Sequence, residues 1–270
     1  MLNVSKIRRN KFTYSDLVLA LKKCGIKKND SVFLTTNISL IGVPKTNTKN
    51  HLLTKCQWIL KGLKKIIGKN GNIFVPTYSY TFDSKKVNTF IVNKTESKIG
   101  YFPNFFLKEN IIRNIDPMVS VSGMGSKAED ILLNSSHTSY GKDCVFERLL
   151  KIKNLKCLTI GLGINWVPFI HYLDWINQVP FRYDKYFKGY IKLNNKKFIL
   201  KWHYPVRYLK DKSSISDGYK LGNLAYKNGM FKKSKIGRSS IYSINYQDYF
   251  YFCKKKTKYN KFLTSNGKKK

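Results

Sequence analysis

His171 and Asp174 lie three positions apart in an otherwise apolar and aromatic segment, NWVPFIHYLDWIN at 165–177. In a helix this spacing places both side chains on the same face, close enough to interact. A carboxylate beside an imidazole fixes its tautomer and raises its basicity, and a general base needs both properties. The same spacing also occurs in helix-face polar pairs that have no catalytic task, and spacing alone favours that second interpretation.

Other candidate nucleophiles and metal ligands are less specific. Cys144, in YGKDCVFERL, has no base partner recognisable in the sequence, so its chance of being a nucleophile rather than a packed thiol is roughly one in ten. The chain has five cysteines, without CxxC spacing, and no His, Cys and carboxylate cluster has the spacing of a metal site. We therefore predict reduced thiols and no metal. His137, in the loop SSHTSYG, could contact a ligand, whereas His51 and His203 are predicted to be structural.

Three polar turns could bind an anion or an acyl carrier chain. LTTNISLIG (34–42) and VPTYS (75–79) each end a predicted strand, and SVSGMGSKA (120–128) is a Ser/Gly-rich turn that opens a predicted helix. Backbone amides and hydroxyls in such turns can hold phosphates, as can a helix N-terminus. None of the three is a GxGxxG or Walker loop, so a dinucleotide or nucleoside triphosphate site has little support.

The elements that must position these residues alternate between helices and strands. Helix 13–26, strand 30–36, helix 51–68 and strand 71–80 follow one another in the first part of the chain. This order is typical of a parallel sheet with crossover helices. A further buried strand at 155–163 ends in GLG directly before the segment that carries the candidate pair. The pair is therefore expected near the carboxyl edge of the sheet, where clefts form.

The rest of the chain completes an α/β fold with a mainly parallel central sheet, flanking helices and a C-terminal portion that contains a hairpin. The strongest hairpin signal is Asn194-Asn195, which joins two alternating runs within 188–203. Residues 81–98 are predicted to form an irregular polar excursion. Further helices are predicted at 99–112 (after Pro103), 126–134, 217–228 and 246–262, and a further strand at 239–244.

We predict a single domain over residues 1–270, with a core at about 14–180, a C-terminal portion at about 181–262 and a basic tail at 263–270. No apolar run approaches the roughly 18 residues of a membrane span. The basic N-terminal segment is not followed by the apolar core of a signal peptide. Together with the dispersed cysteines, these features predict a cytoplasmic protein. They leave the oligomeric state open.

The formal net charge of +36 would suit a nucleic-acid-binding protein, but its distribution does not. Lysines outnumber arginines 44 to 7 and are spread over the whole chain, whereas nucleic-acid readers favour arginine forks and clustered patches. Abundant Lys, Asn, Ile, Tyr and Phe are typical of drift in an AT-rich genome, an interpretation that we favour by about three to one. We predict no specific nucleic-acid partner, although such a surface attracts anions.

The individually weak motifs become informative through their order along the chain. TTNISLIG, IFVPTYS, IGYFPNFF, DPMVSVSGMGSKA, HTSYGKDCVFERLL, CLTIGLG and FIHYLD follow one another between about residues 14 and 180. This series resembles the aminoglycoside 3-N-acetyltransferase family. That family has a His-Ser-Ser-Leu-like turn, a Met-Pro-Thr-Phe-like strand end, a Ser-Val-Ala turn and a His-x-x-Glu near the catalytic centre.

The resemblance implies a CoA-dependent N-acyltransferase whose fold is distinct from that of the common GNAT acetyltransferases. His171 matches the family's general base, and Asp174 stands in place of the glutamate that orients it, with one methylene fewer. Asp116 replaces a histidine, and Cys144-Val145 stand where the family often has Ser-Pro. The acetyl-CoA contacts implied by the resemblance are Thr35, Thr36, Asn37, Ser39, Leu40, Gly42, Thr77, Ser120 and Val121, and we predict acceptor contacts at Tyr78, Asp83 and His137.

The acceptor is predicted from charge to be an amine on an anionic molecule. An aminoglycoside is a polycation and needs carboxylates, but the chain has 15 acidic residues against 51 basic ones. A nucleotide-linked or surface-polysaccharide amino sugar is therefore favoured. An aminoglycoside is the alternative if Asp83, Asp174 and Asp184 form a local acidic pocket. A non-catalytic polyanion-binding protein is a third possibility, which leaves the spacing of the candidate pair unexplained.

Overall fold

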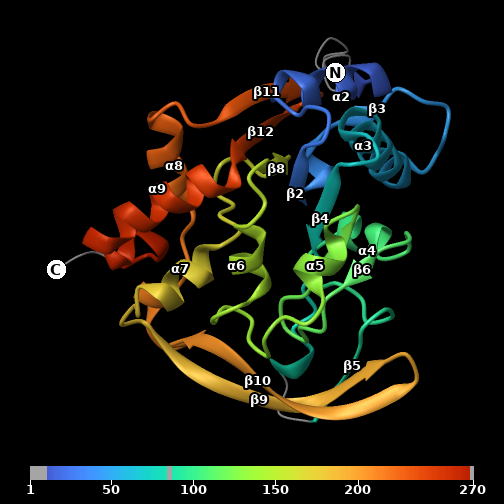
Figure 1. Ribbon diagram of the computed structural model, residues 1–270. Helices are drawn as coiled ribbons and strands as arrows, with labels where there is room; N and C mark the ends of the chain where they lie inside the picture. Colours follow the sequence, from blue (N-terminus) through green and yellow to red (C-terminus); the bar gives the residue numbers. More distant parts are fainter. Residues whose placement is uncertain (1–10, 84–86, 268–270) are drawn as a thin grey trace, which may run out of the picture.

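A mixed sheet of seven strands organises the computed structural model, which describes residues 11–83 and 87–267 (Figure 1). The strand order is β11-β12-β8-β2-β4-β7-β6. Only the three central strands pair in parallel, and the pairs on both flanks are antiparallel. The predicted α/β fold with flanking helices is confirmed, but the sheet is parallel only at its centre. Its strands are β2 (Ser31–Thr36), β4 (Asn72–Pro76), β6 (Ile112–Arg113), β7 (Val121–Met124), β8 (Leu155–Ile160), β11 (Lys232–Ile236) and β12 (Ser239–Asn245).

Each face of the sheet carries its own apolar core because side chains alternate along the strands. In β2, Val32 and Leu34 face the helices α2 (Tyr14–Lys23), α3 (His51–Ile67) and α4 (Tyr101–Phe106). Phe33 faces the opposite core, to which α7 (Ile170–Ile176) and α9 (Tyr246–Tyr259) contribute. The remaining elements are β1 (Lys11–Phe12), β3 (Val43–Pro44), β5 (Thr89–Ile91), α5 (Ala128–Leu132), α6 (Val145–Leu149), β9 (Arg182–Leu193), β10 (Lys196–Arg207), α8 (Tyr219–Lys227) and the 3-10 turns η1 (Ile38–Leu40), η2 (Thr81–Asp83), η3 (Lys212–Ser214) and η4 (Lys261–Thr264).

Three of the predicted helices, α2, α3 and α9, begin at side-chain caps. Thr13 forms a capping box with Asp16 at the start of α2, and the Asn50 side chain accepts a hydrogen bond from Leu53 N at the start of α3. α4 differs from its prediction because it begins before Pro103 rather than after it. Proline is tolerated there, since the first turn of a helix leaves its backbone N–H groups without intrahelical partners.

A long antiparallel ribbon of β9 and β10 forms a second, smaller sheet. Its turn is Asn194-Asn195, as predicted, and both residues have left-handed φ values of 46° and 62°. In Figure 1 the ribbon curves along the lower edge of the molecule, far from α2 and α3. β5 pairs in parallel with β9, so part of the segment predicted to be irregular is a strand. The ribbon starts at Arg182, a residue that becomes important below.

The segment predicted as an anion-binding turn, 120–128, instead contains strand β7, which pairs with β4. Serine and glycine are poor strand formers, so the composition points away from a strand. Close packing explains the glycine, because a Cβ at Gly123 would lie 2.8 Å from Phe74 Cδ1. Tertiary packing therefore outweighs local propensity here. The α5 helix begins at Ala128, the last residue of the predicted turn.

Candidate functional site

His171 and Asp174 meet on α7, as the sequence predicts. His171 Nδ1 lies 3.1 Å from Asp174 Oδ2, so the shorter aspartate reaches the imidazole. The Asp174 side chain is fully buried, whereas the His171 side chain is 21% exposed. Phe169 anchors the start of the helix, with its ring packed edge-on against Tyr246, Tyr249 and Phe250 of α9. A buried carboxylate and a partly exposed imidazole are the arrangement expected of an orienting group and a base.

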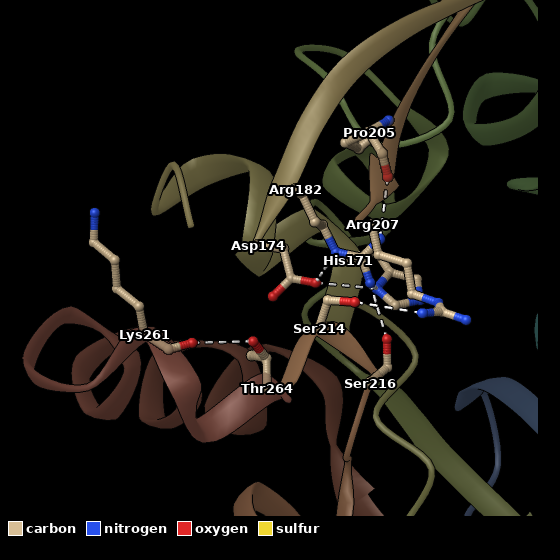
Figure 2. A network of polar contacts seen from close by, with 9 residues as sticks. All are labelled: His171, Asp174, Arg182, Pro205, Arg207, Ser214, Ser216, Lys261 and Thr264. Carbon is tan, nitrogen blue, oxygen red and sulfur yellow. Dashed lines mark hydrogen bonds and ion pairs between the residues drawn. The ribbon is translucent and has the colours of Figure 1, made fainter. Parts of the chain in front are cut away.

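Arg182, at the start of β9, joins this pair, and sequence reasoning missed it. Its Nε donates to Asp174 Oδ2 at 2.6 Å, and its Nη2 lies 2.8 Å from His171 Nδ1. Its Nη1 donates to the Pro205 carbonyl at 3.1 Å and Nη2 also donates to Ser216 Oγ at 2.9 Å. Figure 2 shows the guanidinium lying beside both the carboxylate and the imidazole. The site is therefore a triad in which Asp174 has a permanent counter-ion.

The environment of His171 favours a neutral imidazole. Burial lowers its pKa below the ordinary value and the Arg182 charge lowers it further, while the hydrogen bond and charge of Asp174 act in the opposite direction. A base must be unprotonated to act, so this shift keeps His171 competent at neutral and mildly acidic pH.

Tyr140 and Tyr204 form a tyrosine cluster beside the imidazole. Burial raises the pKa of both tyrosines, and the buried carboxyl of Asp116 contributes to the rise. Tyr140 packs edge-on against His171, with ring centroids 5.2 Å apart, and also against Tyr204 at 5.5 Å. Asp116 is buried, and its Oδ1 accepts from the backbone N–H groups of Met118 at 2.7 Å and Val119 at 3.0 Å. Burial raises the pKa of Asp116 to about 6, against these hydrogen bonds.

We expect Asp116→Asn to stabilise the protein at pH 8. A carboxyl whose folded pKa is raised to about 6 contributes its stability at low pH and loses it as the pH rises through that value. Asparagine keeps the Oδ1 acceptor and never ionises, so the gain should reach up to about 3 kcal/mol at pH 8 and vanish towards pH 4. Urea unfolding at the two pH values measures it. A variant less stable than the wild type at pH 8 would contradict the interpretation that burial disfavours the ionised Asp116.

Four of the predicted acetyl-CoA contacts line one cavity of about 250 Å³ at the end of β2. They are Thr35, Thr36, Asn37 and Ser39, and Trp166 lies on the same wall. The hydroxyls of Thr35 and Thr36 and the indole N–H of Trp166 are buried without a hydrogen-bond partner in the part of the chain that the structure describes. Buried polar groups are normally paired, so three unpaired groups around one cavity suit a ligand that carries amides or carbonyls.

Two cations hold the turn beside this cavity. Lys55 Nζ donates to the Ile38 carbonyl at 3.0 Å, and Arg238 donates to the carbonyls of Ser39 at 2.7 Å and Leu40 at 3.2 Å. Gly237 permits this approach, because it has a φ of +52° and a Cβ there would lie 2.1 Å from Ile41 O. The turn is thus fixed from α3 and from the β11–β12 connection, and both supports are positively charged.

The other predicted acetyl-CoA contacts lie off the cavity wall. Thr77, Ser120 and Val121 are buried where β4 meets β7. Thr77 and Ser120 hydrogen-bond to each other and to Arg113, and Val121 N donates to Asn114 Oδ1 at 2.8 Å. Leu40 is the exposed last residue of the η1 turn, and Gly42 follows that turn. These residues support the strands that carry the cavity, and a direct contact with acetyl-CoA stays a prediction for them.

The predicted acceptor contacts do not converge on one point. Tyr78 is buried and packs against Tyr80 and against Trp166, which lines the cavity of about 250 Å³. Asp83 is exposed in η2, and the His137 ring packs on Trp202. Their contact with an acceptor also stays a prediction. Cys144 is a packed thiol whose pKa burial raises to about 12, so it is protonated at neutral pH.

A second cavity of about 510 Å³ lies beside the triad. Asp174 and Arg182 line it, together with Asp184 and Gln178. Asp184 is exposed and binds His203 Nε2 at 2.7 Å. This cavity therefore adjoins two members of the triad, and Asp184 is its exposed carboxylate.

Two arrangements are absent from the described residues. No group of three or more His, Cys, Asp or Glu side chains among them is arranged to hold a metal ion. In the same residues, no helix is both long and apolar enough to cross a membrane.

A family model for aminoglycoside 3-N-acetyltransferases matches residues 42–258. The chain belongs to this family. It is therefore an acetyltransferase of the antibiotic N-acetyltransferase type, as the motif order predicted. No individual curated protein sequence matches it significantly.

Solved structures show the same fold at low sequence identity. Sisomicin-bound AAC-VIa has a TM-score of 0.79 and 15% identity, and the match covers 92% of this chain and 98% of that one. AAC-IIIb with CoASH has a TM-score of 0.77 and 14% identity, covering 96% and 100%. The YokD protein from Bacillus subtilis has a TM-score of 0.73 and 16% identity, covering 92% and 100%.

Proposed function

We propose that this member of the family transfers the acetyl group of acetyl-CoA to an amine of an aminoglycoside. The family match over residues 42–258 carries the proposal. The neighbouring structures of AAC-VIa with sisomicin and AAC-IIIb with CoASH support it, because their fold is the same. The net charge of the chain predicted an anionic amino sugar as the acceptor, with an aminoglycoside as the alternative. The high positive charge still favours an anionic amino sugar, which is kept as the second candidate.

The residues of the smaller cavity fit acetyl-CoA. Thr35, Thr36 and Trp166 offer three buried polar groups without partners, which amides of the pantetheine arm would satisfy. Lys55 and Arg238 place two positive charges beside the same cavity, and CoA is strongly anionic. When bound, acetyl-CoA supplies an activated acetyl thioester.

His171 is proposed as the general base for the acceptor. An amine arrives mostly as ammonium and must lose a proton before its nitrogen lone pair can attack. Among the described residues, no hydrogen-bond partner lies at His171 Nε2, so this is the ring nitrogen that can face an acceptor. Asp174 would hold the ring and stabilise the imidazolium that forms.

The larger cavity is proposed as the acceptor side. It opens directly beside Asp174 and Arg182, and Asp184 offers an exposed carboxylate to an ammonium group. This local arrangement answers the electrostatic objection to a polycation, since long-range repulsion is screened over about 8–10 Å at physiological salt.

Thiol release from acetyl-CoA tests the proposal, with the five cysteines of the protein accounted for. The panel contains a polycationic aminoglycoside, several nucleotide-linked amino sugars and a no-acceptor control. Release with the aminoglycoside supports the proposed function. Release with amino sugars alone would replace it by the second candidate, and binding of acetyl-CoA without release on any acceptor would contradict both.

We expect Thr35→Val to weaken acetyl-CoA binding up to about tenfold without lowering stability. Valine has the shape of threonine but removes a buried hydroxyl that has no partner, so the free protein loses nothing. Isothermal titration and thermal unfolding measure the two effects. The matched control is Thr159→Val, at the register partner of Thr35 on β8. Its hydroxyl donates to Gly163 O at 2.8 Å, so this variant should lose about 1 kcal/mol of stability.

A further inference from the structure

Two groups place opposite demands on His171 Nδ1. Asp174 Oδ2, at 3.1 Å, can only accept a hydrogen bond, so it requires a proton on Nδ1. Arg182 Nη2, at 2.8 Å, can only donate, so it requires the Nδ1 lone pair. One nitrogen of a neutral imidazole cannot satisfy both. The tautomer of His171 therefore depends on which of these two residues forms the hydrogen bond with Nδ1.

The positions of the guanidinium hydrogens favour a hydrogen bond from Arg182 to Nδ1 over one from Nδ1 to Asp174. Its Nε hydrogen goes to Asp174 Oδ2 at 2.6 Å, so this oxygen already has a short, charge-assisted partner. Of the two Nη2 hydrogens, one goes to Ser216 Oγ at 2.9 Å, and the other faces Nδ1 (Figure 2). Nη1 is held by the Pro205 carbonyl at 3.1 Å. The guanidinium is 6% exposed and fixed on all three nitrogens, so its Nη2 hydrogen cannot simply turn away from the ring.

We propose that Arg182 is a positioning residue that sets the tautomer of His171, holding the proton on Nε2 in the free protein. This inference rests on the proposed role of His171 as the base. In this resting form Nε2 is a donor and cannot take a proton from the acceptor. His171 becomes a base when the ring releases the Arg182 contact and Nδ1 donates to Asp174 instead.

The exchange balances without any added reactant. Nε2 gives its proton to water, and Nδ1 takes one from water, so the imidazole stays neutral and Asp174 stays ionised. The Nη2 hydrogen that faced Nδ1 is then free for water or for a ligand in the adjoining cavity, which Arg182 lines. The triad thus has two arrangements of the same charges, and only one of them leaves Nε2 basic.

The charged and titratable groups that face His171 are few. Asp174 belongs to its own helix, Arg182 comes from β9, and Tyr140 packs on the ring from the loop before α6. Removing the Arg182 charge leaves Asp174 as the only ion beside the imidazole within this set. The His171 pKa should then rise, and the proton should move to Nδ1.

Two-bond ¹H–¹⁵N spectra of the full-length protein test the proposal, because they distinguish protonated from unprotonated ring nitrogens. With His171 assigned by comparison with His171→Ala, the free wild type should show a protonated Nε2 and an unprotonated Nδ1. In Arg182→Met the pattern should reverse and the His171 pKa should rise. Arg182→Lys restores the charge and should return the pKa towards the wild-type value. Arg207→Met is the matched control, since Arg207 lies opposite Arg182 in the ribbon and contacts Ser214, and it should change neither quantity.

A wild-type spectrum with the proton on Nδ1 would overturn the inference, and it needs no variant that must fold. An unchanged pattern in a folded Arg182→Met would overturn it as well. The acid limb of the acetyl-transfer pH profile separates the inference from the proposed function. If His171 is the base, that limb moves to higher pH in Arg182→Met. If the spectra change but the acid limb does not move, Arg182 does set the tautomer of His171, and His171 is not the base.

Discussion

Replacing His171 by alanine is expected to lower kcat for acetyl transfer about 10²–10⁴-fold, with a much smaller change in acetyl-CoA affinity. The imidazole is the partly exposed member of the triad, and its Nε2 is the atom proposed to take the acceptor's proton. The donor cavity is lined by residues of other segments, so acetyl-CoA should still bind. Steady-state kinetics with the accepted amine, together with calorimetric binding of acetyl-CoA, measure the two effects.

His51→Ala is the control for that result. His51 begins α3 on the opposite side of the sheet core and has no contact with the triad. It should keep wild-type turnover. If His171→Ala also keeps wild-type turnover while its fold is intact, His171 is not the base.

Asp174→Asn should cost about 3–5 kcal/mol of folding free energy and lower Tm by on the order of 10 °C. The Asp174 side chain is fully buried and the Arg182 side chain is 6% exposed, so the variant leaves a guanidinium in the interior without its counter-ion. Thermal and urea unfolding at pH 7 measure the loss. Kinetics on the folded fraction should also show a lower kcat, because the imidazolium loses its stabilising charge.

Asp184 is a control for the effect of burial on the stability that a His-Asp pair contributes. Asp184 binds His203 at 2.7 Å, much as Asp174 binds His171, but the Asp184 side chain is 62% exposed. Exposed ion pairs contribute about 0–1 kcal/mol, so Asp184→Asn should hardly change Tm. Equal losses in the two variants would mean that the Asp174–Arg182 pair is not the buried ion pair described above. Asp174→Glu, which restores the residue implied by the family, should lose less stability than Asp174→Asn because it keeps the charge.

The fold could be predicted where periodicity and caps act locally. The helix predicted at 51–68 and the Asn194-Asn195 hairpin are present because apolar spacing and turn residues specify them within a few positions. β7 was missed because its Ser and Gly residues are chosen by contact with Phe74. β5 was missed because its partner, β9, lies about a hundred residues further along the chain. Such pairings leave little local signal.

The residues of the candidate site are likewise predictable only where the sequence signal is local. His171 and Asp174 are predictable because one helical turn brings them together, and the family motifs mark Thr35 to Ser39. Arg182 joins them only through the path of the chain into the ribbon. The sequence did contain a signal for Arg182, because an arginine is unusual in a chain that uses lysine for nearly all its basic residues. Most of the described arginines make several hydrogen bonds through the guanidinium fork, which lysine cannot reproduce: Arg113, Arg148, Arg182 and Arg238. In a lysine-rich chain, each arginine is a position to inspect first.

The contact between Arg238 and the η1 turn has a consequence for how the protein is made. The turn at Ile38–Leu40 leaves the ribosome early, but the guanidinium that binds its carbonyls is added about two hundred residues later. During synthesis the donor cavity therefore stays without one of its two cationic supports until nearly the whole chain has emerged. A nascent chain stalled before β11 should fail to retain acetyl-CoA, even with every residue of the cavity wall already translated. Binding of the donor would then report that synthesis has passed the C-terminal strands.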